Sequence, residues 1–182
     1  MAGGTIWKGI IHFGDTDIPV KLHTAVREER IQLHLLHEPD QARVRQQLIC
    51  TLEKRPVAAE EQSKGFEVGQ GKYILLDPEE LEQAVPESDR KIEVHEFVKT
   101  NQIDPHFLDR IYYLEPDVQA KGYASLAGAL KELDVAGICT WTMRKRSHFG
   151  ALQAIGKVLR LNTLRYADEV VPVRSLDLQN VP

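Results

Sequence analysis

The chain has 182 residues, a formal net charge of −4 and 42% hydrophobic residues, enough to fill the core of one good-sized domain or two small ones. No apolar run reaches the roughly 20 residues that span a bilayer, and the N-terminal MAGGTIWKG lacks the pattern of a signal peptide, so we expect a cytoplasmic protein without a membrane partner. The two cysteines, Cys50 and Cys139, lie far apart in the sequence, which excludes a disulfide framework and a paired-cysteine zinc ribbon.

The N-terminal segment predicts a β-hairpin. Residues 5–13 are rich in β-branched and aromatic side chains, and GDTD at 14–17 is typical of a turn. After the turn, Ile18, Val20 and Leu22 alternate with polar residues, which is the period of a half-buried strand.

Short apolar or alternating runs bounded by Gly, Pro or Asp predict further strands. These runs are RIQLHLLH (30–37), VRQQLICTL (44–52), GKYILLD (71–77), KIEVHEFV (91–98), DRIYYLE (109–115), AGICTWTMRKR (136–146) and GKVLRLNTLRY (156–166). Many strands at short spacing favour a closed or nearly closed β-barrel, because closure removes exposed sheet edges.

Helices are few. Leu126, Leu130 and Leu133 recur at helical spacing, which predicts one amphipathic helix ending before Gly137. DPEELEQAV at 77–85 begins with an aspartate N-cap and a proline and predicts a short helix, and DPHFLDR from 104 predicts a single turn. The fold class is therefore mainly β with a few helices (α+β).

Candidate catalytic and metal-binding groups are weak. His34 and His37 form an HxxH pair, but in a strand they point to opposite faces and bind one ion only if the chain bends after Leu35. No nucleophile elbow, HExxH motif or P-loop is present. We expect no catalytic residue, no metal site and no cofactor.

The basic residues are distributed unevenly. No acidic residue lies between Asp134 and Asp168. Six basic residues fall in this interval: Arg144, Lys145, Arg146, Lys157, Arg160 and Arg165. A positive face is expected despite the acidic total, because local charge density decides the field at contact distance.

The stretch WTMRKRSHFGAL at 141–152 carries the densest positive charge. If residues 138–146 form one strand, Arg144 and Arg146 lie on one face about 7 Å apart, close to the spacing of successive phosphates along a nucleic-acid strand. A solvated strand end and phosphate binding explain this segment about equally well. Three basic clusters on neighbouring strands lining one groove would favour phosphate binding, whereas the lack of interleaved aromatic residues argues against stacking of single-stranded bases.

Seven motifs, in order and spacing, resemble the prokaryotic Ku proteins over about residues 5–178. They are TIWKGIIHFGDTDIPVKLHTAV, IQLHLLH, SKGFEVGQGKYILLDPEELE, IEVHEFV, IDPHFLDRIYYLEPD, MRKRSHFGAL and LNTLRYADEV. The resemblance implies a single core domain over residues 1–182, with barrel strands in about 5–30 and 99–178 and a long arching insertion over about 31–98.

The resemblance also implies a function and partners. Two arches of a homodimer would close a ring that threads onto double-stranded DNA ends and holds the sugar-phosphate backbone without base readout or catalysis, in double-strand break repair by non-homologous end joining. The protein would be nucleoid-associated, and a DNA ligase of that pathway would be its partner. The DNA-facing residues expected in the insertion are Arg43, Arg45, Lys54 and Arg55, and the six basic residues of the acid-free interval are expected in the barrel. Lys8, Lys21 and Arg27 are weaker candidates.

The sequence departs from the family pattern at three places. Only Cys50 stands where members often have a C-P-x-x-G-like turn, and Ser147 replaces a common acidic residue. The sequence stops at SLDLQNVP, so we expect the usual C-terminal extension, associated with ligase recruitment, to be absent.

Two other functions remain open. One is a β-barrel dimerisation or scaffold module without DNA binding, which the overall acidity favours. The other is a metal-dependent nuclease that uses His34, His37 and acidic neighbours.

Overall fold

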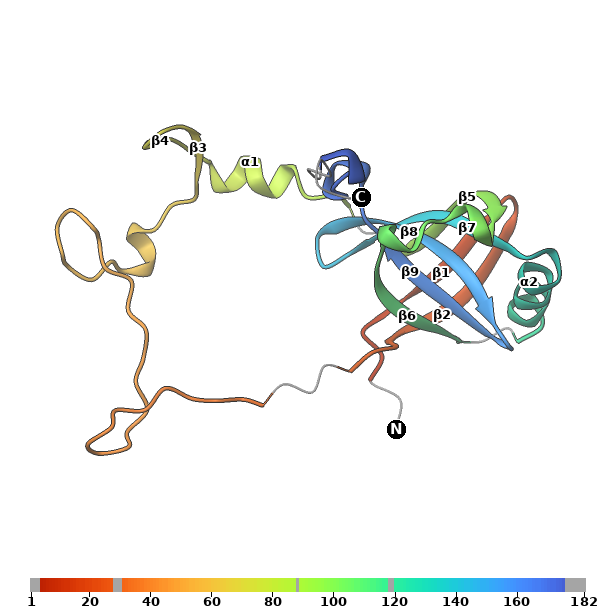
Figure 1. Ribbon diagram of the computed structural model, residues 1–182, viewed down its shortest axis with the longest axis horizontal. Helices are drawn as coiled ribbons and strands as arrows, with labels where there is room; N and C mark the ends of the chain where they lie inside the picture. The colour runs from red at the N-terminus through yellow and green to blue at the C-terminus, as the bar shows by residue number, and fades with distance from the viewer. Residues whose placement is uncertain (1–3, 28–30, 88, 118–119, 176–182) are drawn as a thin grey trace, which may run out of the picture. The chain divides into compact units, whose positions relative to one another are not determined.

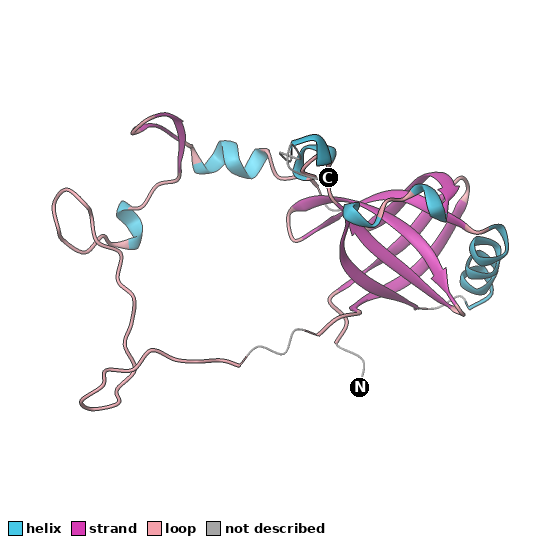
Figure 2. Cartoon of the chain, viewed as in Figure 1, coloured by secondary structure: helices cyan, strands magenta, loops and turns pink. Residues whose placement is uncertain are grey.

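The computed structural model describes residues 4–27, 31–87, 89–117 and 120–175. The chain divides into two compact units, one formed by residues 1–27 and 86–182 and the other by residues 28–85 (Figure 1). The helices and strands of both units are distinguished by colour in Figure 2.

The first unit is a closed seven-stranded barrel, as the sequence predicts. Its strands are β1 (Trp7–Phe13), β2 (Thr16–Thr24), β5 (Lys91–Lys99), β6 (Leu108–Pro116), β7 (Val135–Met143), β8 (Arg146–Ile155) and β9 (Val158–Leu164). They follow the order β1-β2-β6-β9-β8-β7-β5, and a parallel pairing of β5 with β1 closes the barrel. The other six pairings are antiparallel.

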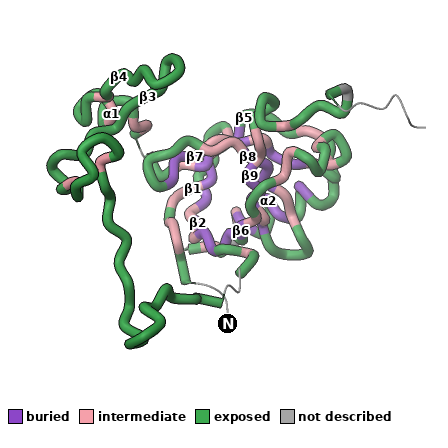
Figure 3. The backbone as a smooth tube through the Cα atoms, turned by 60° about the vertical axis from the view of Figure 1, so that its left-hand side comes forward, coloured by how far each residue is buried: buried purple, intermediate pink, exposed green. Residues whose placement is uncertain are grey.

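The core fills the barrel because alternate side chains of each strand point inward. Ile18, Val20 and Leu22 of β2 are buried as their alternation predicts. Figure 3 shows the buried residues gathered in the barrel strands and α2. Burying one such aliphatic side chain contributes about 1.5–3 kcal/mol, so the barrel has a substantial core of its own.

The amphipathic helix α2 (Ala120–Leu133) packs against β7 and β8. Its buried face is formed by Tyr123, Leu126, Ala127 and Leu130. Leu133 was predicted on this face, but it is 58% exposed because the helix ends there and the chain turns into β7. Tyr123 completes the face at the other end, and its hydroxyl bonds to backbone groups of β6 and β9.

The second unit contains little regular structure. Its elements are a 3₁₀ turn (Ala59–Glu61), a two-stranded ribbon of β3 (Gly65–Gly69) and β4 (Lys72–Leu75), and the short helix α1 (Pro78–Gln83). Asp77 caps α1 by accepting a hydrogen bond from the Glu79 amide, as its sequence predicts. No residue in 31–85 is buried.

The strands predicted at 30–37 and 44–52 are wrong. Over residues 31–37 and 44–52 the structure has only two isolated bridges, Leu36 to Arg43 and Ile49 to Pro56, and residue 30 lies outside the described residues. A strand needs a neighbour along its length, and these segments have none within residues 31–85.

The boundary of the insertion also differs from the expectation. β5 (Lys91–Lys99) belongs to the barrel, so the second unit ends at residue 85 and not near 98. Four short 3₁₀ turns lie in the barrel unit, at Thr100–Gln102, Pro105–Phe107, Ala167–Glu169 and Val173–Ser175. Residues 28–30, 118–119 and 176–178 of the expected barrel ranges lie outside the described residues. Among the described helices, none is long and apolar enough to cross a membrane.

Candidate nucleic-acid interface

The dense basic stretch folds as a hairpin and not as one continuous strand. β7 ends at Met143 and β8 begins at Arg146, and these two residues form the last pair of the ladder. Arg144 and Lys145 make the turn with φ values of 52° and 63°. Positive φ at both central residues is typical of a type I′ hairpin turn, in which Asn and Gly are usual. The predicted placement of Arg144 and Arg146 on one strand face is therefore wrong.

The turn places its three basic residues in solvent. Arg144, Lys145 and Arg146 are all exposed. Across the described residues, none of the three makes a hydrogen bond or an ion pair with its side chain. Non-glycine residues at positive φ cost of order 1 kcal/mol or more each, and such strain often marks a functional position.

A hollow at this end of the barrel, here called the rim cavity, has a volume of about 680 Å³. It is lined by Ile6, by residues of β2, β6, the β7–β8 hairpin and β9, and by residues after β9. Its polar and aromatic lining includes Arg110, Arg144, Arg146, His148, Arg165 and Tyr166. The structure thus brings together three of the predicted residues, Arg144, Arg146 and Arg165.

Arg110 joins these residues because β6 is irregular. The register of β6 against β9 shifts between Leu108 and Ile111. In a regular strand, neighbours point to opposite faces, whereas Asp109 and Arg110 both line the rim cavity. Arg110 could not be predicted as a site residue from the sequence, because nothing in DRIYYLE signals a bulge.

The charges of the rim cavity are partly balanced. Arg165 lies 3.1 Å from the Asp109 carboxylate and also donates to the backbone carbonyl of His106 at 3.2 Å. The Arg110 Nε lies 3.8 Å from Asp109. Arg165 is therefore held in place by its own unit, whereas Arg144 and Arg146 keep their donors in solvent.

The pKa of His148 depends on the burial of its ring and on the charges that line the rim cavity. Its pKa is lowered from the ordinary value of 6.5, first by burial and further by the nearby charges of Arg110 and Arg146. A hydrogen bond with the backbone of Met143 and the charge of Asp109 act in the opposite direction. The net effect is a lowered pKa, in which burial of the ring is the largest cause and the two arginines add to it.

Lys157 and Arg160 lie apart from the rim cavity. Lys157 is exposed in the turn between β8 and β9, at the opposite end of β8 from Arg144. Ten residues of strand separate the two turns, about 30 Å at ~3.3 Å per residue. Arg160 is half-buried and donates to the Gln153 side chain at 2.5 Å. In the described part of the chain, Lys157 and Arg160 therefore do not line the rim cavity with Arg144, Arg146 and Arg165.

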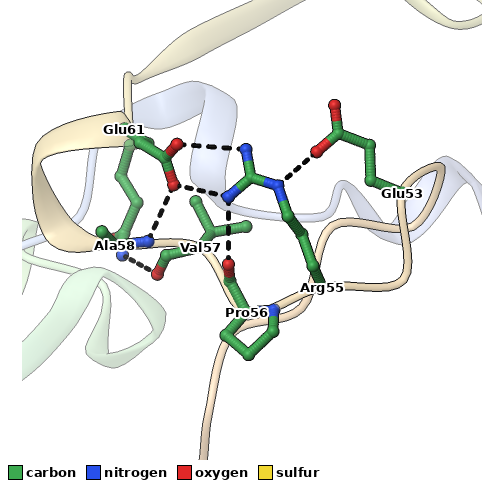
Figure 4. Close-up of polar contacts among 7 residues, drawn as sticks. Glu53, Arg55, Pro56, Val57, Ala58 and Glu61 are labelled. Carbon is green, nitrogen blue, oxygen red and sulfur yellow. Dashed lines mark hydrogen bonds and ion pairs between the residues drawn. The ribbon is translucent and has the colours of Figure 1, made fainter.

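The basic residues of the second unit differ in their surroundings. Arg43, Arg45 and Lys54 are exposed. Arg55 forms two hydrogen bonds with the Glu61 carboxylate at 2.9 and 3.0 Å, and its Nε donates to Glu53 at 2.5 Å (Figure 4). These contacts raise the pKa of Arg55 and lower that of Glu61.

Arg55 thus ties the loop before the 3₁₀ turn to the turn itself. Glu61 also accepts from the Ala58 amide, so one carboxylate joins the Arg55 guanidinium to the backbone (Figure 4). A guanidinium with most of its donors in use has few left for a phosphate. Among the weaker candidates, Lys21 is similarly engaged, because its ammonium lies 2.8 Å from Asp117.

In the described residues, the histidine pair is not part of a cluster of three or more metal-ligand residues. The His37 Nδ1 lies 2.8 Å from Asp40, which also accepts from the Ala42 amide. Within the part of the chain that the structure describes, no group of three or more His, Cys, Asp or Glu residues is placed to hold a metal ion. Cys139 is buried, which raises the pKa of its thiol to about 12.

Comparisons with known proteins agree with the barrel. The family model described as the Ku70/Ku80 beta-barrel domain matches residues 12–181. The chain is 68% identical, over 100% of its length and 71% of the relative's, to "Non-homologous end joining protein Ku 2" of Geotalea uraniireducens (strain Rf4). It is 39% identical to the "Non-homologous end joining protein Ku" of Anaeromyxobacter sp. (strain K), covering 95% of this chain and 59% of that protein. The same identity holds for the protein of that name from Koribacter versatilis (strain Ellin345), over 91% and 58%. The chain spans less than two thirds of the length of these last two relatives.

Proposed function

This chain belongs to the Ku family, and from that premise we propose that it binds the ends of double-stranded DNA as a ring-shaped homodimer. Binding would be independent of sequence, through the sugar-phosphate backbone, and would serve double-strand break repair by non-homologous end joining, at the nucleoid. It needs no catalytic residue and no cofactor.

The observation that carries DNA binding is the pair of exposed guanidinium groups of Arg144 and Arg146 at the rim cavity, which have no ion-pair partner among the described residues. Surface arginines in a folded protein commonly contact carboxylates, and in the described residues these two contact none. Because a backbone contact replaces counterions around DNA, such groups make binding salt-dependent and insensitive to sequence.

The contribution of the other predicted residues follows from their surroundings. Arg43, Arg45 and Lys54 have the exposure that phosphate contacts require. We propose a smaller direct role for Arg55, because its guanidinium is already bound by two carboxylates. Lys157 and Arg160 would contact DNA only along a path separate from the rim cavity.

The second copy of the chain is proposed from the apolar surface of residues 31–85. Ile31, Leu33 and Leu52 are 88%, 87% and 90% exposed. Thirteen large apolar side chains of this unit are exposed in all; the others are Leu35, Leu36, Val44, Leu48, Ile49, Phe66, Val68, Tyr73, Ile74 and Leu75. An apolar surface of this extent usually marks an interface. The unpaired extended segments that resemble strands in sequence would pair with those of the second copy.

Sedimentation analysis tests the homodimer. The wild-type chain should sediment as a dimer, and Leu33→Asp with Leu35→Asp should yield monomers, because charges at an apolar interface are costly to bury. Lys72→Gln in the same unit is the control and should leave the dimer intact. A monomeric wild type would contradict the proposal.

A mobility-shift titration on a linear duplex and a closed circle of the same sequence tests DNA-end binding. The proposal expects salt-sensitive binding to the linear form alone. Equal binding to both forms would indicate an open basic groove, and binding to neither would favour the scaffold function.

Ligase recruitment is the remaining part of the proposal. A DNA ligase of the end-joining pathway should join linear duplexes faster in the presence of this chain, because the ring would hold ends where the ligase can reach them. No increase in ligation at saturating DNA binding would argue against recruitment by these 182 residues.

A further inference from the structure

The rim cavity is lined by more guanidinium groups than carboxylates. Four guanidinium groups line it, those of Arg110, Arg144, Arg146 and Arg165, against the carboxylates of Asp109 and Glu169. Asp109 is shared by Arg165 and Arg110, and Glu169 accepts a hydrogen bond from the Tyr166 amide at 2.7 Å. The cavity therefore retains a net charge of about two, centred on the hairpin arginines.

Two stacked aromatic side chains, Phe149 and Tyr166, line the rim cavity together with these arginines. Tyr166 follows Arg165 directly and stacks on Phe149 of β8, with ring centroids 6.5 Å apart and an interplanar angle of 20°. Tyr166 is 55% exposed, so its ring is open to solvent as well as to Phe149. A smaller hollow of about 290 Å³ shares Phe149, Leu164, Arg165 and Tyr166 with the rim cavity. An aromatic ring open to solvent next to guanidinium groups is the arrangement on which nucleobases stack.

We propose that the rim cavity binds the phosphomonoester of a nucleotide, with the phosphate at Arg144 and Arg146 and the base against Tyr166. The proposal rests on DNA-end binding and deepens it, because the 5′-phosphate at a DNA end is such a group. The volume of about 680 Å³ lies in the range of about 300–1,000 Å³ found for small-ligand sites.

Charge distinguishes this ligand from the rest of the DNA backbone. An internal phosphodiester carries one negative charge, whereas a phosphomonoester carries about −1.5 to −2 at neutral pH and offers three acceptor oxygens. The exposed guanidinium groups of Arg144 and Arg146 can each bind such a group through two parallel hydrogen bonds. Arg144 and Arg146 can thus contact an internal phosphate of a threaded duplex, and they would bind a terminal phosphate more tightly.

The lowered pKa of His148 is consistent with a phosphate site in the rim cavity. Burial lowers the His148 pKa most and the charges of Arg110 and Arg146 lower it further, and a phosphate at Arg146 would offset one of these two charges. An anion bound there should raise the His148 pKa, which makes this ring a local probe of the cavity.

Duplexes of one sequence with either 5′-phosphate or 5′-hydroxyl ends test the proposal. Wild-type protein should bind the phosphorylated duplex about tenfold more tightly. Arg146→Gln and Arg146→Lys should both reduce this preference, since the lysine keeps the charge and loses the planar fork. Lys131→Gln, at an exposed position of α2 that does not line the rim cavity, is the matched control and should retain the preference.

Binding of a free mononucleotide is the second test of the proposal. All residues that line the rim cavity belong to the barrel unit, so a small ligand can bind there without a ring around DNA. Titration with 2′-deoxyadenosine 5′-monophosphate should shift the His148 resonances and raise their apparent pKa, more strongly than inorganic phosphate at equal concentration. Tyr166→Ala should remove the advantage of the nucleotide over inorganic phosphate, whereas Tyr113→Ala on the outside of β6 should not.

The outcomes separate this proposal from DNA-end binding. Equal affinity for the two duplexes would overturn the phosphomonoester site and leave DNA-end binding intact. Binding to neither duplex, with a normal response of His148 to the mononucleotide, would support the site and contradict DNA-end binding. No response of His148 to the mononucleotide would overturn the site.

Discussion

Trp141 of β7 and His148 of β8 lie directly opposite each other in the ladder, and their rings stack with centroids 5.2 Å apart. Gly150, two residues further along β8, leaves room for the indole, because a Cβ at that position would lie 2.6 Å from the Trp141 ring. The stack holds His148 in place between the buried indole and the basic rim cavity.

The lowered pKa of His148 predicts a pH dependence of stability. In the folded protein the pKa lies below 6.5, so the unfolded chain binds the proton more readily. The stabilisation is therefore complete above about pH 6.5 and is lost as the pH falls through the folded-state pKa. Urea unfolding at pH 7.5 and pH 5.5 should show a lower midpoint at the acidic pH.

His148→Gln is the control for that measurement and should reduce the difference between the two pH values. Four carboxyl groups also have lowered pKa values, those of Asp40, Glu61, Asp104 and Asp117. Their ordinary values of 3.8 and 4.5 place their effect below pH 5. An unchanged pH difference in the glutamine variant would show that His148 is not its source.

Substitution of the two residues in the β7–β8 turn should have opposite effects on stability and on DNA binding. Arg144→Asn with Lys145→Gly supplies residues that adopt positive φ readily, so the free energy of unfolding should rise by about 1 kcal/mol. The same change removes two exposed positive charges and should weaken duplex binding equally for all sequences. Thermal unfolding and mobility-shift titration on the same preparation measure both effects. A variant that is stabilised and binds DNA as tightly as wild type would exclude this turn from the interface.

The hydroxyl of Tyr123 fixes α2 to two strands of the barrel. Its hydroxyl donates to the Leu114 carbonyl of β6 at 2.5 Å and accepts from the Leu159 amide of β9 at 2.7 Å. Tyr123→Phe leaves both buried backbone groups short of a partner and should lower the free energy of unfolding by about 1–3 kcal/mol. Tyr113→Phe, on the exposed face of β6, is the control and should change stability by less than about 0.5 kcal/mol. Equal effects of the two variants would contradict the bridging role of the Tyr123 hydroxyl.

Arg55 and the pair Arg43 and Arg45 should behave differently. Arg55→Gln removes the contacts with Glu61, so the pKa of Glu61 should return towards 4.5 and the loop around it should lose order, as seen by NMR. Arg43→Gln with Arg45→Gln should leave that loop unchanged and reduce the salt dependence of duplex binding, by about 0.9 in slope for each lost phosphate contact. If Arg55→Gln alone lowered the slope while the Glu61 pKa stayed low, Arg55 would be a direct contact.

Much of the barrel could be predicted from the sequence because its strands alternate apolar and polar residues. β8 was missed, since it buries Gly150, Ala151 and Leu152 in succession, and because Arg144 and Lys145 carry no glycine or asparagine signal for a turn. The strands predicted in 30–37 and 44–52 are wrong although these segments do alternate apolar and polar residues. Their alternation is real, but alternation shows which face is apolar and not whether a neighbouring strand is present.

The candidate site could be predicted only in part. The acid-free interval indicates a basic surface, and Arg144, Arg146 and Arg165 do meet at the rim cavity. The position of Arg110 at the rim cavity depends on a bulge in β6. The separation of Lys157 from Arg144 depends on β8, which runs from one turn to the other. Neither feature is encoded in local composition.

Threading through a DNA end is the central claim, and trapping by circularisation tests it most directly. The protein is loaded on a linear duplex, the ends are then ligated into a circle, and the complex is challenged with high salt beside a sample in which the circle was closed before loading. Because screening weakens phosphate contacts but cannot open a closed topology, the account predicts protein retained only on the DNA circularised after loading. Equal release from both samples would contradict a ring around the duplex.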